Sequence, residues 1–117
     1  MYRKLWNGAH KVYLASLEKD GETYLKVGTT SYLDAMDRFR YCNDKYPISD
    51  VFKNIRICAS WTVSDIKTAK EIERKILNGW GPKEFRIEKY CGGITDIRPY
   101  SAQRYAIAKS TINSLRK

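Results

Sequence analysis

An Asp-Gly pair between two alternating runs of apolar and polar residues constrains the fold of this chain most. The runs are HKVYLASL (residues 10–17) and ETYLKVG (residues 22–28), and Asp-Gly at 20–21 is typical of a two-residue hairpin turn. Pairing Lys19 with Glu22 fixes the register, because a shift by one residue would exchange the two faces of each strand. Counting outward gives three cross-strand pairs on one face: Leu17 with Tyr24, Ala15 with Lys26, and Tyr13 with Gly28.

The two faces of this hairpin differ in character, because strand side chains point alternately to opposite sides of a sheet. One face is wholly apolar and is expected to face the core: Val12, Leu14, Leu25 and Val27. The other face carries a patch of Tyr13, Tyr24 and Lys26, in which Gly28 leaves room for a ligand to approach. Tyrosine and lysine are also ordinary on a solvated sheet face, which is the alternative interpretation of the patch.

A carboxylate falls in the middle of the apolar face of a predicted helix over Asp65–Trp80. At about 100° per residue, six apolar residues share one arc: Ile66, Ala69, Ile72, Ile76, Leu77 and Trp80. Glu73 points into this arc, whereas Glu71 points away from it. A buried carboxylate without a partner costs several kcal/mol, so Glu73 needs a metal ion, another cation or a basic side chain beside it. A structural ion pair with lysine or arginine satisfies this need as well as a functional site does.

The remaining elements are predicted from apolar spacing and from capping residues. They are a helix at about Leu33–Cys42, a strand at about Val51–Trp61, a short edge strand at Glu84–Lys89 and a last helix from Pro99 to about Leu115. We expect an α/β (α+β) fold: a small, mainly antiparallel three-stranded sheet flanked by helices. One domain spans residues 1–117, with a core at about 10–90 and a C-terminal helix at about 99–115.

The charge balance of the chain favours an anionic partner. Lys and Arg number 22 against 13 Asp and Glu, which gives a formal net charge of +9 on 117 residues. No stretch approaches the about 20 apolar residues that span a membrane, and we expect an intracellular protein. The chain has one histidine and three widely spaced cysteines, a pattern that does not match a zinc site.

The order of several segments resembles the GIY-YIG endonuclease superfamily, in particular a small, often phage-encoded branch whose second motif reads K-I-G. The segments are KVYLASL, YLKVGTT, DAMDRF, AKEIERKIL and PKEFRI, which together cover about residues 10–90. The resemblance implies that a tyrosine, a glycine, an arginine and a glutamate converge on a site that cleaves phosphodiester bonds with one divalent metal ion. By this match the four residues are Tyr13, Gly28, Arg38 and Glu73.

The resemblance also assigns roles to these side chains. Glu73 binds Mg²⁺ or Mn²⁺, for which a single carboxylate suffices because such ions keep several water ligands. Tyr13 acts as general base toward water, and Arg38 clamps the phosphate with its planar guanidinium. Arg40 flanks the same apolar stripe of its predicted helix as Arg38, and only the resemblance favours Arg38.

Two motif positions depart from the family. Lys11 stands where the first motif has a glycine, and Lys26 stands where the second motif has a tyrosine. Lys26 and Tyr24 both lie on the face of Tyr13 in the predicted register, so each is a candidate to replace the missing tyrosine. The family's histidine on its first helix and its late asparagine have no clear counterpart here.

We therefore expect a metal-dependent endonuclease that cleaves DNA, or else RNA or a small nucleotide, with low sequence specificity. Catalysis would use Tyr13, Lys26, Arg38 and Glu73. The residues expected to bind nucleic acid are Tyr24, Arg40, Arg98, Arg104 and Lys109. The alternative is a catalytically inactive GIY-YIG-like module that binds nucleic acid or a protein partner. Either protein would be a monomer or weak dimer, located in the host-cell cytoplasm if it is phage-encoded.

Overall fold

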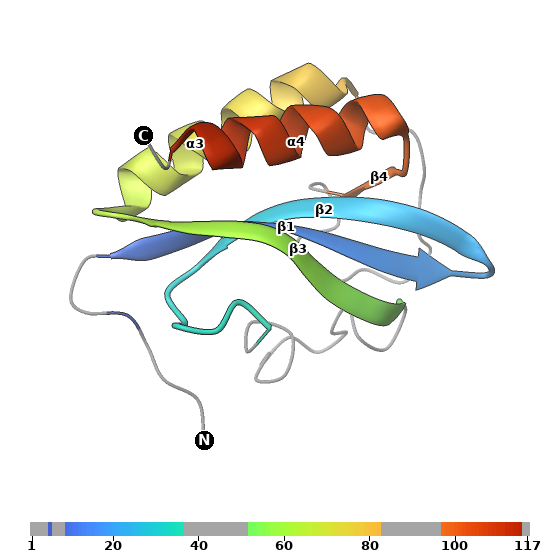
Figure 1. Ribbon diagram of the computed structural model, residues 1–117, viewed down its shortest axis with the longest axis horizontal. Coiled ribbons are helices and arrows are strands. Elements are labelled where there is room, and N and C mark those ends of the chain that lie inside the picture. The colour runs from blue at the N-terminus through green and yellow to red at the C-terminus, as the bar shows by residue number, and fades with distance from the viewer. Residues whose placement is uncertain (1–4, 6–8, 37–51, 83–96, 116–117) are drawn as a thin grey trace.

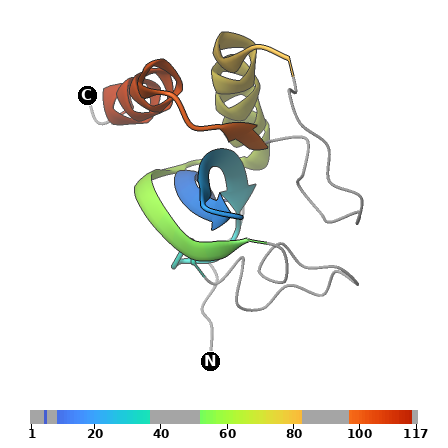
Figure 2. The same cartoon turned by 90° about the vertical axis from the view of Figure 1, so that its right-hand side faces the viewer.

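A four-stranded antiparallel sheet carries two helices on one of its faces (Figures 1 and 2). The computed structural model describes residues 5, 9–36, 52–82 and 97–115. The elements are β1 (His10–Lys19), β2 (Glu22–Thr30), β3 (Lys53–Val63), α3 (Ile66–Trp80), β4 (Ile97–Pro99) and α4 (Ala102–Ser114). The strand order is β3-β1-β2-β4, and Figure 2 shows α3 above the β2–β4 side of the sheet and α4 above the β1–β3 side. The predicted α+β class is confirmed.

The hairpin of β1 and β2 has the predicted register. Tyr13 lies opposite Gly28, Ala15 lies opposite Lys26, and Lys19 lies opposite Glu22. The turn residues Asp20 and Gly21 have φ angles of 53° and 80°. Positive φ at both central positions is characteristic of the type I′ turn, whose twist matches that of the paired strands. The local turn chemistry therefore determines which residues share a face.

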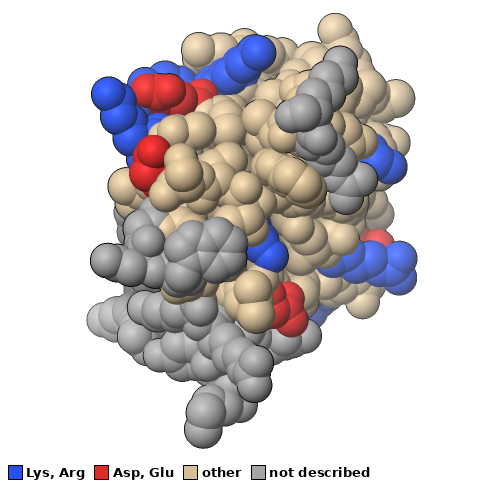
Figure 3. Space-filling model, turned by 60° about the vertical axis from the view of Figure 1, so that its left-hand side comes forward, with Lys and Arg blue, Asp and Glu red and all other residues tan. Residues whose placement is uncertain are grey.

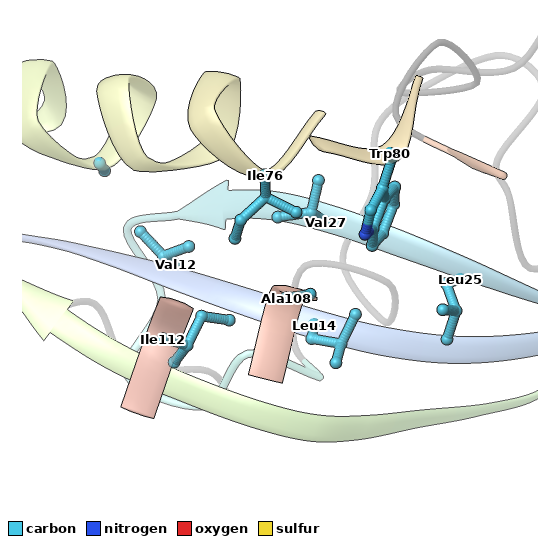
Figure 4. Close-up of a cluster of buried hydrophobic side chains, with 9 residues drawn as sticks. Val12, Leu14, Leu25, Val27, Ile76, Trp80, Ala108 and Ile112 are labelled. Atoms are coloured by element: carbon cyan, nitrogen blue, oxygen red, sulfur yellow. The ribbon is translucent and has the colours of Figure 1, made fainter. Parts of the chain in front are cut away.

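The predicted apolar face of the hairpin forms the core beneath the helices (Figure 4). Its four hairpin residues are fully buried: Val12, Leu14, Leu25 and Val27. Helix α3 covers them with Ala69, Ile76 and Trp80, and α4 contributes Ala108 and Ile112. Burial of this apolar surface is the main contribution that attaches both helices to the sheet.

The opposite face of the sheet is also buried, which differs from the open patch expected there. Tyr13, Ala15 and Leu17 are at most 1% exposed and pack with Phe52 and Ile97. The hairpin thus has two buried faces, although only one of them is wholly apolar. The alternation of strand side chains predicted which residues share this face. It could not predict that other segments of the chain cover the face.

The fourth strand was not predicted, because β4 has only three residues and ends in proline. Its pairing with Tyr24–Lys26 of β2 makes it an edge strand, where proline is tolerated. Helix α4 consequently begins later than predicted, after the N-cap Ser101, whose hydroxyl accepts a hydrogen bond from the Arg104 amide. Ala108 and Ile112, near the middle and the end of α4, are buried.

Helix α3 has the predicted boundaries. Asp65 is its N-cap and accepts a hydrogen bond of 2.7 Å from the Thr68 amide, which holds the pKa of Asp65 below its usual value. The helix ends at Trp80, followed by Gly81 at a φ of 88°. The predicted strand at Val51–Trp61 is found as β3. Residues 33–36 form a bend and a turn; the rest of the predicted helix at 33–42 and the strand predicted at Glu84–Lys89 lie outside the described residues.

Candidate functional site

The ring of Tyr13 lies directly across Gly28. The two residues are paired on neighbouring strands, and a Cβ atom at Gly28 would lie 2.6 Å from ring carbon Cζ of Tyr13 and closer still to its hydroxyl. No real side chain tolerates such a contact, so glycine is required at this position. The space that we expected a ligand to use is thus occupied by the tyrosine itself, whose hydroxyl is directed over β2.

Lys26 lies on the same face of the sheet as Tyr13. Its ammonium nitrogen is 5.8 Å from the centroid of the Tyr13 ring, within the range of a cation–π contact. Only 4% of Lys26 and 1% of Tyr13 is exposed. The structure therefore brings together two of the four predicted catalytic residues. Both Arg38 and Arg40 lie outside the described residues.

Glu73 is withdrawn from solvent on helix α3, as its helical position predicts. Its side chain is 12% exposed, whereas Glu71 is classed as exposed. The Nζ of Lys70 lies 3.9 Å from Oε1 of Glu73. This distance is at the limit of an ion pair, and the Lys70 side chain is 53% exposed, so the pair itself contributes little to stability.

The position of Glu73 along the sheet follows from its neighbour Ile76. Figure 4 shows Ile76 next to Val27, with α3 running antiparallel to β2. Glu73 lies three residues before Ile76, or about 4.5 Å back along the helix axis. One strand residue spans about 3.4 Å, so a displacement of about 4.5 Å from Val27 along β2 reaches the level of Gly28 or Thr29.

The direction of Glu73 around the helix follows from Gly79. A Cβ atom at Gly79 would lie 3.1 Å from Cγ2 of Ile107, so this side of α3 faces α4. At about 100° per residue, Gly79 and Glu73 lie about 60° to either side of the sheet-facing Ile76. Glu73 is therefore on the flank of α3 that is turned away from α4, toward the outer side of β2.

Glu73 and Tyr13 approach β2 from opposite faces of the sheet. Helix α3 covers one face, and the ring of Tyr13 lies on the other, at the same level along the strand. Within the described residues, β4 pairs with β2 at Tyr24–Lys26. We call the segment Gly28–Thr30 of β2 the β2 edge; Gly28 and Thr30 are buried and Thr29 is half-buried.

Two arginines expected to bind phosphate instead hold the C-terminus of α3. Arg98 is 6% exposed, and its Nε donates to the carbonyl of Gly81 at 3.1 Å. Arg104 donates from Nε to the carbonyl of Trp80 at 3.1 Å and from Nη1 to that of Pro99 at 3.0 Å. Carbonyls at a helix end lack helical partners and carry partial negative charge, which explains the attraction of both guanidinium groups. The assignment of these arginines to a nucleic-acid surface is therefore corrected.

We expect Arg104→Ala to lower the free energy of unfolding by about 2 kcal/mol, because it removes charged hydrogen bonds to main-chain carbonyls. Urea denaturation would measure the change. Arg74→Ala is a matched control, because Arg74 is exposed on α3; it should shift stability by no more than about 0.5 kcal/mol. Equal effects of the two substitutions would contradict the role assigned to Arg104.

The other two predicted nucleic-acid contacts occupy different surroundings. Tyr24 is partly buried and packs edge-on against Phe52, with 5.5 Å between ring centroids. Lys109 is exposed on α4, where its Nζ lies 5.3 Å from the ring centroid of Tyr105 and 3.3 Å from its hydroxyl. Lys109 therefore remains available to an anionic partner, whereas Tyr24 contributes mainly to packing.

Sequence reasoning overlooked Lys70 and Arg74, which lie on the Glu73 flank of α3. The helical spacing that revealed Glu73 could have found them, since residues three and four apart share a helix face. Within residues 5, 9–36, 52–82 and 97–115, no cluster of three or more His, Cys, Asp or Glu residues could hold a metal ion. None of the helices that the structure describes is long and apolar enough to cross a membrane.

Comparisons of the chain with family models, with curated proteins and with solved structures give no match. The resemblance to GIY-YIG endonucleases consequently rests on the order of the motif residues in the sequence.

Proposed function

We propose that this protein is a metal-dependent nuclease that hydrolyses phosphodiester bonds in DNA at the β2 edge. The observation that carries the proposal is the burial of Glu73, a carboxylate that is 12% exposed on α3. Ideal helix geometry supports the proposal, because it directs this side chain toward the level of Gly28. A carboxylate in such a place needs a cation beside it. Lys70 provides one, with its Nζ 3.9 Å from Oε1 of Glu73, and a bound metal ion would provide another.

The oxygen of Glu73 suits Mg²⁺ or Mn²⁺, which are commonly held by one or two carboxylates together with water and substrate oxygens. When bound, the ion would neutralise charge on the phosphate and favour deprotonation of water. Tyr13, whose oxygen lies over Gly28, would first lose its phenolic proton to solvent, and the phenolate would then accept a proton from the attacking water. Lys26 would stabilise negative charge on the Tyr13 oxygen, because its ammonium lies beside the ring. Arg38 remains the predicted phosphate clamp.

The proposed substrate is DNA. RNA is the other polymer whose phosphodiester bonds the same reaction could hydrolyse. A domain of 117 residues has few side chains left for reading base edges, so we propose low sequence specificity. The proposal places the protein inside the cell, as a monomer or a weak dimer.

The second candidate function is a GIY-YIG-like module that binds nucleic acid or a protein without cleaving. The burial of Tyr13 and Lys26 favours this candidate, because a general base must come within hydrogen-bond reach of water and substrate. The departures at Lys11 and Lys26 are consistent with it too.

Incubation with end-labelled single- and double-stranded DNA distinguishes the two functions. The nuclease predicts cleavage in Mg²⁺ or Mn²⁺ that stops on addition of a chelator, at many positions rather than one. A binding module predicts retarded but intact DNA in every metal condition. Intact DNA at high protein concentration with both metals would exclude the proposed reaction on this substrate.

A further inference from the structure

The charged residues on the solvent side of α3 are not evenly mixed. Five are classed as exposed: Lys67, Lys70, Glu71, Arg74 and Lys75. Figure 3 shows lysine and arginine side chains around acidic ones at the upper left, the side on which α3 lies. Lys67 and Lys75 lie four residues before and after Glu71. Their positive charges offset the negative charge of Glu71 on the side of the helix remote from Glu73.

Lys70 and Arg74 form a like-charged pair on the solvent side of α3. They are four residues apart, a spacing at which like charges destabilise an isolated helix. At about 100° per residue they lie about 60° and 100° around the helix from Glu73, on its solvent side. Lys70 Nζ lies 3.9 Å from Oε1 of Glu73, and Arg74 lies three residues after Glu71, so each cation has one carboxylate as a helical neighbour. Arg74 makes no hydrogen bond or ion pair with any part of the chain that the structure describes.

We propose that Lys70 and Arg74 bind consecutive phosphates of the nucleic-acid strand that flanks the β2 edge. This inference rests on the proposed function and names the surface that holds its substrate. Both side chains are exposed, so their positive charges are accessible to a strand in solvent. Their α-carbons are separated by about 6 Å along the helix axis, a length that covers about two phosphates of a strand.

The other basic groups near α4 are less suited to this role. Arg98 and Arg104 are committed to main-chain carbonyls at the end of α3. Lys109 is exposed, but it lies on α4, the helix from which the Glu73 flank is turned away. Lys70 and Arg74 are described, exposed cations on the side of α3 that carries Glu73, and Lys67 lies one turn before Lys70.

The test compares two double variants with the same change in net charge. Lys70→Gln/Arg74→Gln removes the pair, whereas Lys53→Gln/Lys75→Gln removes two exposed lysines elsewhere, on β3 and on the far side of α3. Fluorescence anisotropy with a labelled oligonucleotide, in chelator and over a range of salt concentrations, gives the affinity and its salt dependence. For Lys70→Gln/Arg74→Gln, we expect the slope of log K against log salt to become shallower by about 1.4 on single strands or about 1.8 on duplex. The control should keep the wild-type slope.

Equal slopes for the two double variants would overturn the inference, as would a wild-type protein that binds neither oligonucleotide. If Lys70→Gln/Arg74→Gln proves unfolded by circular dichroism, the single variants Lys70→Gln and Arg74→Gln replace it, each with an expected slope change of about half. The binding measurement contains no metal and no cleavage step. An absence of nuclease activity would therefore leave its result unchanged, and the two proposals can fail separately.

Discussion

Replacement of Glu73 by glutamine is expected to lower metal-dependent DNA cleavage by a factor on the order of 10³ or more. Glu73 is the carboxylate proposed to hold the metal, and transition-state stabilisation by a metal ion amounts to several kcal/mol, with a tenfold rate change for each 1.36 kcal/mol. Initial rates at saturating Mg²⁺ and Mn²⁺ give the comparison. The neutral amide keeps the size of the side chain, so the packing of α3 on the sheet should be preserved.

A matched variant separates metal binding from general charge effects. Glu71→Gln makes the same chemical change two residues away, on the exposed side of α3, and its cleavage rate should stay close to that of the wild type. Thermal unfolding in chelator provides a second readout. If Glu73 were purely a partner for a structural cation, Glu73→Gln would destabilise the fold and leave the metal dependence of cleavage intact.

Replacement of Gly28 by alanine is expected to destabilise the protein by about 1–3 kcal/mol, the usual cost of overpacking a buried site. The added methyl group would overlap the ring and hydroxyl of Tyr13. Because Tyr13 is buried, its ring cannot turn freely into solvent. Displacement of the hydroxyl by about 1 Å would also lower the cleavage rate by about 10²-fold. Urea denaturation and single-turnover cleavage measure the two effects.

A double-mutant cycle connects the Gly28 effect to Tyr13. Tyr13→Phe removes the nearest overlapping atom but leaves ring carbon Cζ close to the new methyl group. Gly28→Ala should therefore cost less stability in the Tyr13→Phe background, with a coupling energy of at least about 0.5 kcal/mol. The neighbouring substitution Thr29→Ala should show no such coupling. Additive stability effects of Gly28→Ala and Tyr13→Phe would mean that the ring does not constrain the residue opposite it.

The features predicted correctly from the sequence are those determined by local chemistry. The Asp-Gly turn fixed the register of the hairpin, and strand alternation then assigned Val12 and Val27 to one face and Tyr13 to the other. The period of α3 likewise predicted that Glu73 is withdrawn from solvent and that Glu71 is not. Such patterns are reliable because each depends on geometry within a few residues.

The features that were missed depend on contacts between distant segments. Strand β4 is too short to have a pattern of its own and exists because it pairs with Tyr24–Lys26. Arginine is typical of phosphate-binding surfaces, yet Arg98 and Arg104 bind main-chain carbonyls at the end of α3. Spacing within one helix or strand carries no information on which distant groups will become neighbours. The placement of Glu73 and Tyr13 on opposite faces of β2 could not be foreseen for the same reason.

The central claim is that Glu73 and the Gly28 region of β2 belong to one metal site. Titration of ¹⁵N-labelled protein with Mn²⁺ tests it directly, since the paramagnetic ion broadens the amide signals nearest to it. We predict selective broadening of Gly28 and Thr29, little effect at Asp20 and Gly21 in the hairpin turn, and loss of the selective effect in Glu73→Gln. Broadening that avoids Gly28, or that persists unchanged in Glu73→Gln, would contradict a metal site at the β2 edge.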